Sequence, residues 1–320
     1  MAEEKLKWIL PSDHPVIRAD ICLAALIPDF TRAAISRMIR EGRVLADGER
    51  LAKAGFKVRP GNVLEIILPR KQPTDAVARD LPFTVVYEDN DILVVNKPRG
   101  MVVHPAAGHR DDTLVNALLS RYGNQLSAIN GEIRPGIVHR LDKDTSGLML
   151  VARNNRAHLG LSEQLKRHTV RRIYTVLTDG TPSLAEFIVE APIGRHPVQR
   201  KKMAVTEKGR PARTRFTMLE AFRGAACLQA ALETGRTHQI RVHLAFAGYP
   251  VLGDPLYNPK RSDLYRSLAT AIPDLPAGQW LHAGSLTFRH PVLQTDMSFE
   301  APLPPELEHV LQWLRENRKE

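Results

Sequence analysis

The sequence has few of the features that mark secreted, membrane-spanning or zinc-binding proteins. Cys22 and Cys227 are its two cysteines, about two hundred residues apart, so neither a disulfide framework nor a paired-cysteine zinc site is expected. The N-terminal segment is charged and lacks the apolar core of a signal peptide. No stretch approaches the ~18 apolar residues that a membrane span needs. These absences predict a cytoplasmic protein without a membrane partner.

Several catalytic signatures are missing as well. There is no phosphate-binding loop, no dinucleotide-binding glycine pattern, no nucleophile elbow and no zinc-protease helix. His238 and His243 are five residues apart on an expected helix and would point in different directions, so a shared metal is not expected. Chemistry that depends on a bound nucleotide or on zinc is therefore set aside.

What the sequence does have is an excess of positive charge. Lysine and arginine total 45 against 35 acidic residues, which gives a formal net charge of +10. A polyanionic partner such as nucleic acid would explain the excess, and a basic surface that serves solubility is the alternative. The hydrophobic content of 43% is that of an ordinary folded protein.

The length predicts more than one domain. At 320 residues the chain exceeds the ~250 to 300 at which single cores tend to divide. Two prolines among polar residues, between Pro69 and Asp75, show no periodicity and indicate a linker. We expect four segments: an N-terminal tail at residues 1–15, a small domain at 16–70, the linker at 71–81 and a large domain at 82–320.

The small domain is expected to combine two helices with short strands. An apolar run at residues 21–27 precedes Thr31, which suits the N-cap of a second helix that ends at Gly42. Strands follow on either side of the turn at Asp47 and Gly48. The second helix has an apolar face and a basic one. Its candidate RNA-backbone contacts are Arg32, Arg37 and Arg40.

The large domain mixes strands and helices without a regular alternation. Short apolar runs predict strands at residues 92–95, 148–152, 173–177 and 227–232. Helices are expected at residues 155–166 and 237–247, the second ending before Gly248. This irregular order favours an α+β fold over a doubly wound sheet.

The densest polar cluster of the chain runs from His139 to Gly147, between an apolar segment and an expected strand. A loop in that position can hold side chains over a cleft. Asp142 is its candidate catalytic residue, with Asp144 second to it. The alternative is a turn in which either carboxylate accepts a bond from the backbone.

A second cluster, from Gly235 to His243, begins a helix after an expected strand. Arg241 lies one turn into this helix beside apolar neighbours, so we expect it to be partly buried. A partly buried arginine needs a carboxylate, which could belong to the site or to an ion pair that holds helix to sheet.

A third stretch, residues 194–215, is strongly basic and has the single acid Glu207. Such a stretch could contact phosphates without reading sequence, and a solvated run of charge is the alternative. Its eight cations are Arg195, Arg200, Lys201, Lys202, Lys208, Arg210, Arg213 and Arg215.

These clusters together resemble the RluA/RluD family of pseudouridine synthases, whose hallmark is H-R-L-D-x-x-T-S/T-G. The hallmark matches residues 139–147, and further family motifs follow the same order along more than two hundred residues. They are Asn96-Lys97-Pro98 with His104-Pro105, Tyr174 after Arg171-Arg172, Gly194 to Pro197, Gly235 to His243, Gly253-Asp254-Pro255, Leu281-His282-Ala283 and His290-Pro291. The small domain is similar to an S4 RNA-binding module, with Ala46-Asp47 in place of the more usual Val-Asn.

The resemblance implies a fold and a set of roles. The fold would be α+β, with a large mixed, mainly antiparallel sheet flanked by helices and an S4-like domain before it. Asp142 would be catalytic, Tyr174 would pack on the uracil, and Arg241 would pair with the carboxylate, with Arg236 as the second choice for that pairing. The further substrate-binding residues would be His139, Arg140, which enters the RNA stack, Arg236 and Leu281.

The resemblance also implies the reaction and the partner. Uridine becomes pseudouridine when its N1 glycosidic bond breaks and C5 joins the ribose, so no electron or phosphoryl group is transferred and no cofactor is needed. A buried base must be flipped out, at a cost of a few kcal/mol. The expected substrate is large-subunit ribosomal RNA, free or in a pre-ribosomal particle, with no DNA partner, and the expected oligomeric state is a monomer.

Two other readings remain open from the sequence. The first is a non-catalytic RNA-binding protein that keeps the fold, and the complete set of Asp142, Tyr174 and Arg241 argues against it. The second is a hydrolase that cleaves the glycosidic bond. Such an enzyme usually has a second carboxylate, and Asp144 would face away from Asp142 if the segment were extended.

Overall fold

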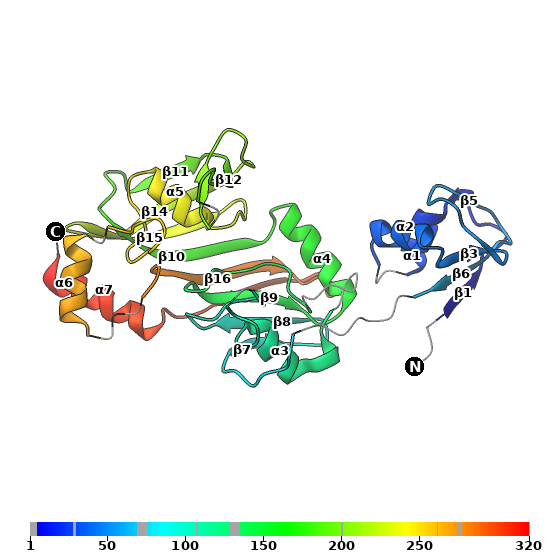
Figure 1. Ribbon diagram of the computed structural model, residues 1–320, viewed down its shortest axis with the longest axis horizontal. Coiled ribbons are helices and arrows are strands. Elements are labelled where there is room, and N and C mark those ends of the chain that lie inside the picture. Colours follow the sequence, from blue (N-terminus) through cyan, green and yellow to red (C-terminus); the bar gives the residue numbers. More distant parts are fainter. Residues whose placement is uncertain are drawn as a thin grey trace.

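The computed structural model describes residues 5–27, 30–68, 76–106, 108–127, 135–199, 201–260, 262–273, 275 and 277–319. Figure 1 shows two units, a small one formed by the N-terminal residues and a large one formed by the rest of the chain. Their buried apolar residues belong to separate clusters, so each unit has a core of its own.

The small unit has a four-stranded sheet in the order β1-β6-β3-β4, a two-stranded sheet and two helices. The helix predicted after Thr31 is confirmed, because the Thr31 hydroxyl accepts from the Ala34 amide at 3.1 Å and Gly42 follows the helix with a φ of +71°. The elements are β1 (Lys5–Ile9), β2 (Ile17–Arg18), α1 (Ala19–Leu26), α2 (Arg32–Arg40), β3 (Val44–Ala46), β4 (Glu49–Arg50), β5 (Lys57–Val58) and β6 (Val63–Ile67).

The N-terminal segment corrects the expected division of the chain. Residues 1–15 were expected to form a tail, but Lys5–Ile9 is a strand that pairs antiparallel with β6. Partly buried and exposed side chains alternate along this strand, so one of its faces rests on the small core. The second half of the expected linker is also attached, because Ala76 is buried in the large core and the Arg79 amide donates to the carbonyl of Asn116. Residues 69–75 lie outside the described residues.

Asp20 organises the face of the small unit where basic residues were expected. It is almost fully buried and accepts from Arg18 Nε at 2.9 Å, Arg32 Nε at 2.8 Å and the Ser36 hydroxyl at 3.5 Å. The hydrogen bond from Arg18 is the main reason why the pKa of Asp20 falls to about 2. Arg32, a candidate RNA contact, is thus held in place by an ion pair, while Arg40 is exposed.

The large unit is built on a nine-stranded sheet in the order β11-β14-β15-β10-β16-β9-β8-β7, with β17 beside β16. Every strand pair is antiparallel except β16 with β9, so the expected mixed, mainly antiparallel sheet is confirmed. Its strands are β7 (Thr84–Glu88), β8 (Ile92–Lys97), β9 (Ser146–Ala152), β10 (Arg171–Asp179), β11 (Glu186–Glu190), β14 (Arg213–Phe222), β15 (Ala225–Leu232), β16 (Leu281–Arg289) and β17 (Asp296–Glu300). A separate hairpin is formed by β12 (Ile193–Arg195) and β13 (Met203–Val205).

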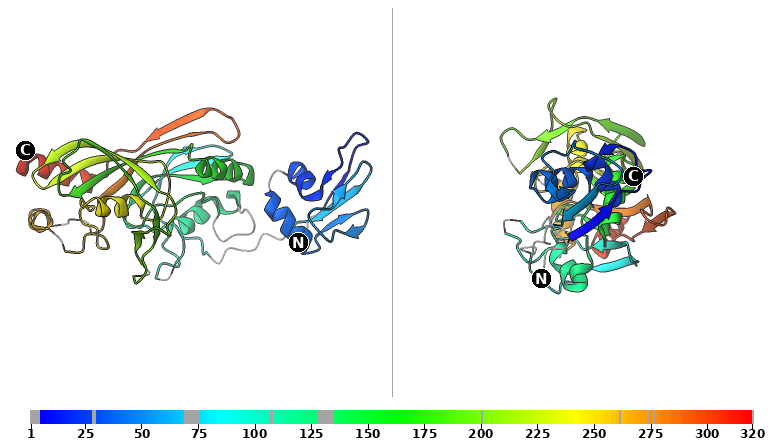
Figure 2. Two further views of the ribbon diagram at one scale, coloured as in Figure 1. Left: turned by 90° about the horizontal axis from the view of Figure 1, so that it is seen from above. Right: turned by 90° about the vertical axis from the view of Figure 1, so that its right-hand side faces the viewer.

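Helices cover both faces of the strands at one side of this sheet. Leu93 and Val95 of β8 pack in the cluster that contains α3, whereas Ile92 and Val94 pack in the cluster that contains α4. Figures 1 and 2 show α3 and α4 near one end of the unit and the C-terminal helix near the other. The helical elements are α3 (Leu114–Tyr122), the short η1 (Gly123–Gln125), α4 (Asn155–Lys166), α5 (Gln239–Phe246), α6 (Asp263–Ala271) and α7 (Pro305–Asn317). None of the described helices is long and apolar enough to cross a membrane.

The parallel contact between β16 and β9 positions the loop that carries Asp142. Ser146 is opposite His282 and Gly147 is opposite Ala283, so the loop before β9 meets the start of β16. Gly147 has a φ of +116°, and a Cβ there would lie 2.3 Å from the Ala283 carbonyl oxygen. A side chain at this position would push the two strands apart, so the close approach requires glycine.

Replacing Asp20 with asparagine removes the negative charge that accepts hydrogen bonds from Arg18, Arg32 and Ser36. We expect amide exchange within residues 17–64 to become roughly tenfold faster, as for the loss of one charge-assisted hydrogen bond, and exchange in the large unit to stay unchanged. The pKa of Asp20 is lower in the folded protein than its ordinary value of 3.8, so the ionised carboxylate stabilises the fold at pH values above 3.8. This contribution to the free energy of unfolding is lost as the pH falls through about 2. Exchange mass spectrometry on the full chain measures both effects.

The matched control is Asp13→Asn, which changes an exposed acid of the same unit. Equal effects of the two substitutions would show that Asp20 has no special part in holding the small unit together.

Candidate active site

A cavity of about 460 Å³ opens beside the start of α5 and brings the two polar clusters of the sequence together. Its lining includes the loop from Val138 to Asp142, the segment from Gly235 to Arg241 and the end of α4. Seven of the ten candidate site residues lie in this lining: Asp142, Tyr174, Arg241, His139, Arg140, Arg236 and Leu281. The other three, Arg32, Arg37 and Arg40, belong to α2 of the small unit.

Asp142 lies in a turn, but its side chain does not cap the backbone in the described residues. The turn is closed by the main chain, because the Thr145 amide donates to the Asp142 carbonyl at 3.1 Å. The carboxylate instead accepts from Arg241 Nη1 at 2.8 Å and remains partly exposed to the cavity, with 18% of its side chain accessible. The alternative in which Asp142 is only a turn-former is therefore wrong.

Asp144 does not supply a second carboxylate to the cavity. Its side chain lies against Gly278, where an added Cβ would approach Asp144 Oδ2 to 2.5 Å. Among the described residues that line the cavity, Asp142 is the one carboxylate, and it faces five cations. These cations are Arg140, Lys166, Arg172, Arg236 and Arg241.

Arg241 is held between two carboxylates. Its Nε donates to Asp254 Oδ2 at 2.6 Å and its Nη2 to Asp254 Oδ1 at 2.9 Å, which leaves Nη1 for Asp142. Burial opposes the charge of the guanidinium, but the bonds to Asp254 and Asp142 outweigh it, and the pKa of Arg241 is raised. Arg241 thus makes the predicted ion pair, and Arg236 is not needed for it, since Arg236 Nε donates to the Pro211 carbonyl.

Asp254, for which no role was expected, anchors Arg241 from the interior. It is fully buried and also accepts from the amides of Leu256 and Tyr257 at 2.8 and 3.0 Å. The motif Gly253-Asp254-Pro255 was the available signal, but the sequence alone gave no partner for its carboxylate. Asp254 fixes the guanidinium, and the guanidinium fixes Asp142.

His238 and Tyr257 extend this network on the other side of Asp142. The Tyr257 hydroxyl accepts from the Met203 amide at 2.9 Å and lies within hydrogen-bonding distance of His238 Nδ1, at 2.9 Å. The other ring nitrogen, His238 Nε2, lies 3.7 Å from Asp142 Oδ1. Burial lowers the pKa of His238, which keeps the ring neutral. The chain of contacts links the hairpin β12–β13 to the loop that carries Asp142.

The remaining lining residues differ in burial and in their hydrogen bonds to the protein. Tyr174 is almost fully buried, and burial raises the pKa of its hydroxyl, so it stays protonated. His139 Nε2 accepts from the Leu150 amide at 2.9 Å, and burial together with the charge of Arg172 lowers the pKa of His139 to about 3. His139 therefore ties the loop to β9, while Arg140 is exposed and free to reach a ligand.

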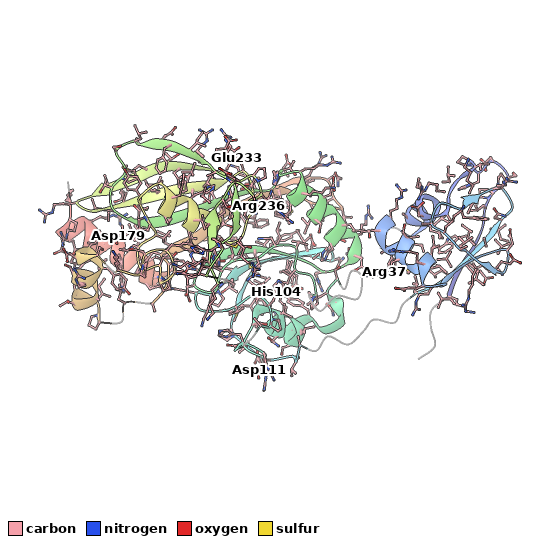
Figure 3. The ribbon with its side chains drawn as sticks, turned by 45° about the horizontal axis from the view of Figure 1, so that its top comes forward. Arg37, His104, Asp111, Asp179, Glu233 and Arg236 are labelled. Carbon is pink, nitrogen blue, oxygen red and sulfur yellow. The ribbon has the colours of Figure 1, made fainter. Side chains whose placement is uncertain are left out.

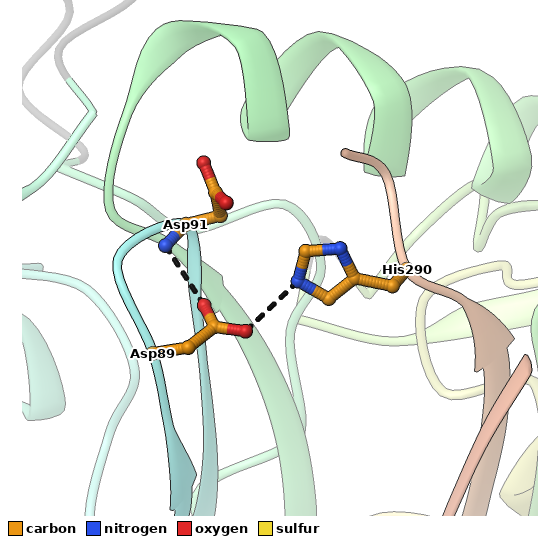
Figure 4. A group of neighbouring side chains, drawn as sticks. All are labelled: Asp89, Asp91 and His290. Carbon is orange, nitrogen blue, oxygen red and sulfur yellow. Dashed lines mark hydrogen bonds and ion pairs between the residues drawn. The ribbon is translucent and has the colours of Figure 1, made fainter. Parts of the chain in front are cut away.

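A second group of acid and histidine side chains could suggest a metal site. Ligand atoms of Asp89, Asp91 and His290 lie within 4.8 Å of one another (Figure 4). His290 Nδ1 accepts from the amides of Val292 and Leu293, so its proton is on Nε2, which donates to Asp89 at 2.9 Å. No lone pair of this ring is left for a metal, and the group serves to join the β7–β8 turn to the end of β16.

The basic stretch at residues 194–215 surrounds the hairpin β12–β13 and the start of β14. Arg195, Lys201, Lys208, Arg210 and Arg215 are exposed, while Arg213 pairs with Glu190 and Glu233. Arg200 lies outside the described residues. Glu233 and Arg236, which are labelled in Figure 3, both follow the end of β15 in the sequence.

Comparisons with known proteins agree on one family. Residues 91–246 match the family described as RNA pseudouridylate synthase, and residues 17–64 match the S4 domain. The chain is 43% identical to "Uncharacterized RNA pseudouridine synthase YlyB" of Bacillus subtilis, over 94% of this chain and 95% of that protein. It is 42% identical to "Ribosomal large subunit pseudouridine synthase D" of Pseudomonas aeruginosa, over 94% and 93%.

A solved structure shares the fold. The chain is similar to "Human RNA Pseudouridylate Synthase Domain Containing 4", with a TM-score of 0.55 and 25% sequence identity over 72% of this chain and 92% of that one.

Asp254→Asn tests which carboxylate anchors Arg241. Removing one partner of a buried ion pair costs about 3 kcal/mol, so we expect the unfolding temperature to fall by roughly 6 to 12 °C. Asp142→Asn is the matched control at the same guanidinium and should change the temperature by less than a third of that, because Asp142 borders the open cavity. Scanning calorimetry of both variants measures the difference, and equal losses would contradict the assignment of Asp254 as the anchor.

Proposed function

This chain belongs to the RNA pseudouridine synthase family, whose members are isomerases that act on RNA, and we propose that its substrate is large-subunit ribosomal RNA. Relatives called "Ribosomal large subunit pseudouridine synthase D" match nearly the whole chain at 40 to 42% identity. The S4 match at residues 17–64 supports a second contact with structured RNA. In this proposal residues 16–70 bind RNA and residues 82–320 carry the chemistry.

One observation supports the proposal most strongly: the described lining of the cavity has one carboxylate, which a guanidinium holds, and five cations. The cations suit the phosphates of RNA, and the lone carboxylate suits an isomerisation that needs one acid group. A hydrolase that cleaves glycosidic bonds usually has two, and Asp144 faces Gly278 instead of the cavity. A purely RNA-binding protein would have no need to hold Asp142 at the edge of a cavity through a buried guanidinium.

The residues of the cavity divide the reaction among them. Tyr174 stacks on the flipped uracil, where base–aromatic stacking is worth ~1 to 3 kcal/mol, and Arg140 fills the gap that the base leaves in the RNA. Asp142 acts at the ribose, either by attack on the sugar carbon or by removal of a sugar proton. Arg241 orients the carboxylate in both routes, and the buried Leu281 forms part of the cavity lining.

The chemistry is balanced without another reactant. The N1 glycosidic bond breaks, C5 of the rotated uracil bonds to the same ribose carbon, the proton of C5 leaves and N1 gains a proton. No residue of the cavity has to transfer electrons. The enzyme would act as a monomer in the cytoplasm, on free ribosomal RNA or on an assembling subunit.

The first test follows the proton that leaves C5. We expect the protein to release tritium from large-subunit ribosomal RNA labelled at uracil C5, and Asp142→Asn to reduce the rate by at least about 10⁴-fold while RNA affinity stays within about threefold. Small-subunit ribosomal RNA labelled in the same way is the control substrate. Full release by the variant would remove Asp142 from the mechanism, and equal release from both RNAs would remove the proposed specificity.

A second test separates binding from chemistry. The small unit has a core of its own, so a chain that begins at residue 76 should keep its catalytic unit folded. We expect the shortened chain to bind structured RNA at least about tenfold more weakly, with a rate at saturating RNA close to that of the full chain. Filter binding and tritium release measure the two quantities. Equal affinities would show that residues 16–70 do not contribute to RNA binding.

A further inference from the structure

Arg172 is a buried arginine without an anion. The residue is 8% exposed, and its Nε is fully buried without a hydrogen-bond partner among the described residues. No described residue accepts a hydrogen bond from its guanidinium or forms an ion pair with it. Arg241, buried to a similar extent, has two carboxylates. Since a buried guanidinium needs compensation, the partner of Arg172 has to come from outside the described chain.

Arg172 lies where two cavities meet. The active-site cavity adjoins a second one of about 830 Å³ over the ends of β10, β14 and β15. The two linings share three residues: His168, Arg172 and Leu232. Gly235 leaves room for the guanidinium, because a Cβ there would lie 2.7 Å from Arg172 Nη1. A ligand that extends from one cavity into the other would therefore pass this side chain.

The charges of the second cavity leave Arg172 uncompensated. Its two acids are Glu190 and Glu233, and both pair with Arg213. Arg171 and Arg215 also line this cavity, so its lining is basic after that pairing. Burial lowers the pKa of His139, and the positive charge of Arg172 lowers it further.

We propose that Arg172 binds a backbone phosphate of the substrate RNA next to the flipped uridine, at the passage between the two cavities. The inference rests on the proposed function and deepens it. Arg172 and Tyr174 are two residues apart on β10 and so point to the same face, ~7 Å apart along the strand. A nucleoside stacked on Tyr174 thus brings its own backbone to the guanidinium, whose planar donors match two phosphate oxygens.

This role makes an unusual prediction about stability. Arg172→Met keeps much of the volume but removes a charge that the free protein does not pair. We expect its unfolding temperature to be equal to or higher than that of the natural chain, whereas its KM for RNA rises about 10- to 100-fold. The rate at saturating RNA should stay within about threefold. The slope of log affinity against log salt should fall by about 0.7 to 0.9, the share of one phosphate contact.

Two further variants make the test specific. Strands β14 and β15 form a hairpin whose open end borders the second cavity, and Arg223 is exposed at the turn that closes its opposite end. Arg223→Met should therefore leave KM and the salt slope unchanged. Arg172→Lys keeps the charge without the planar donors and should recover part of the lost affinity. Binding is then compared on RNAs in which single phosphates near the target uridine are replaced by uncharged methylphosphonates. At one position we expect the natural chain and Arg172→Met to bind equally well.

The outcomes separate this inference from the proposed function. A natural chain that binds RNA but releases no tritium would contradict the proposed function, while the salt slopes and methylphosphonate series would still test Arg172. An Arg172→Met variant that unfolds at a lower temperature, or fails to fold, would show that the guanidinium is structural. An unchanged salt slope, or the absence of any phosphate position that equalises the two proteins, would also overturn the inference.

Discussion

The structure of the site depends on one guanidinium that is shared by two carboxylates. Asp254 accepts from two of the nitrogens of Arg241 and leaves the third for Asp142, so the orientation of the Asp142 carboxylate is set from the interior of the fold. Burial strengthens this arrangement, because charges of opposite sign interact more strongly away from water. His238 approaches Asp142 from the other side. The carboxylate is thereby held in place without a bond to the backbone of its own loop.

The sheet brings these residues together from distant parts of the chain. The loop with Asp142 ends at β9, Tyr174 belongs to β10 and Arg241 to α5, and Leu281 begins β16. The parallel pair β16–β9 is the exception in an otherwise antiparallel sheet, and it places the start of both strands at the cavity. Loops and strand ends on a rigid sheet are the usual location of reactive side chains. The parallel pair β16–β9 therefore lies at the edge of the cavity, with Thr145 before β9 and Leu281 of β16 in its lining.

The sequence predicted those parts that depend on local chemistry or on a motif. The helix after Thr31, the strand that follows the Asp142 loop and the pairing of Asp142 with Arg241 are of this kind. It did not predict β1, because an edge strand of five residues is defined by its partner β6, which lies far along the chain. It also left Asp254 without a role, since a buried carboxylate is explained only by the donor it meets in space. The unpaired state of Arg172 likewise depends on which acids the fold brings near.

The contact between β9 and β16 also affects how the protein is made. The hydroxyl of Ser146 and the ring of His282 are 2.9 Å apart but 136 residues apart in sequence. A ribosome synthesises the Asp142 loop long before it synthesises the strand on which that loop rests. Contacts of such long range form late and slowly in folding. A nascent chain that stops before β16 thus has every residue of the Asp142–Arg241–Asp254 network but lacks the strand against which the Asp142 loop rests, so this network can be completed only after β16 has joined the sheet.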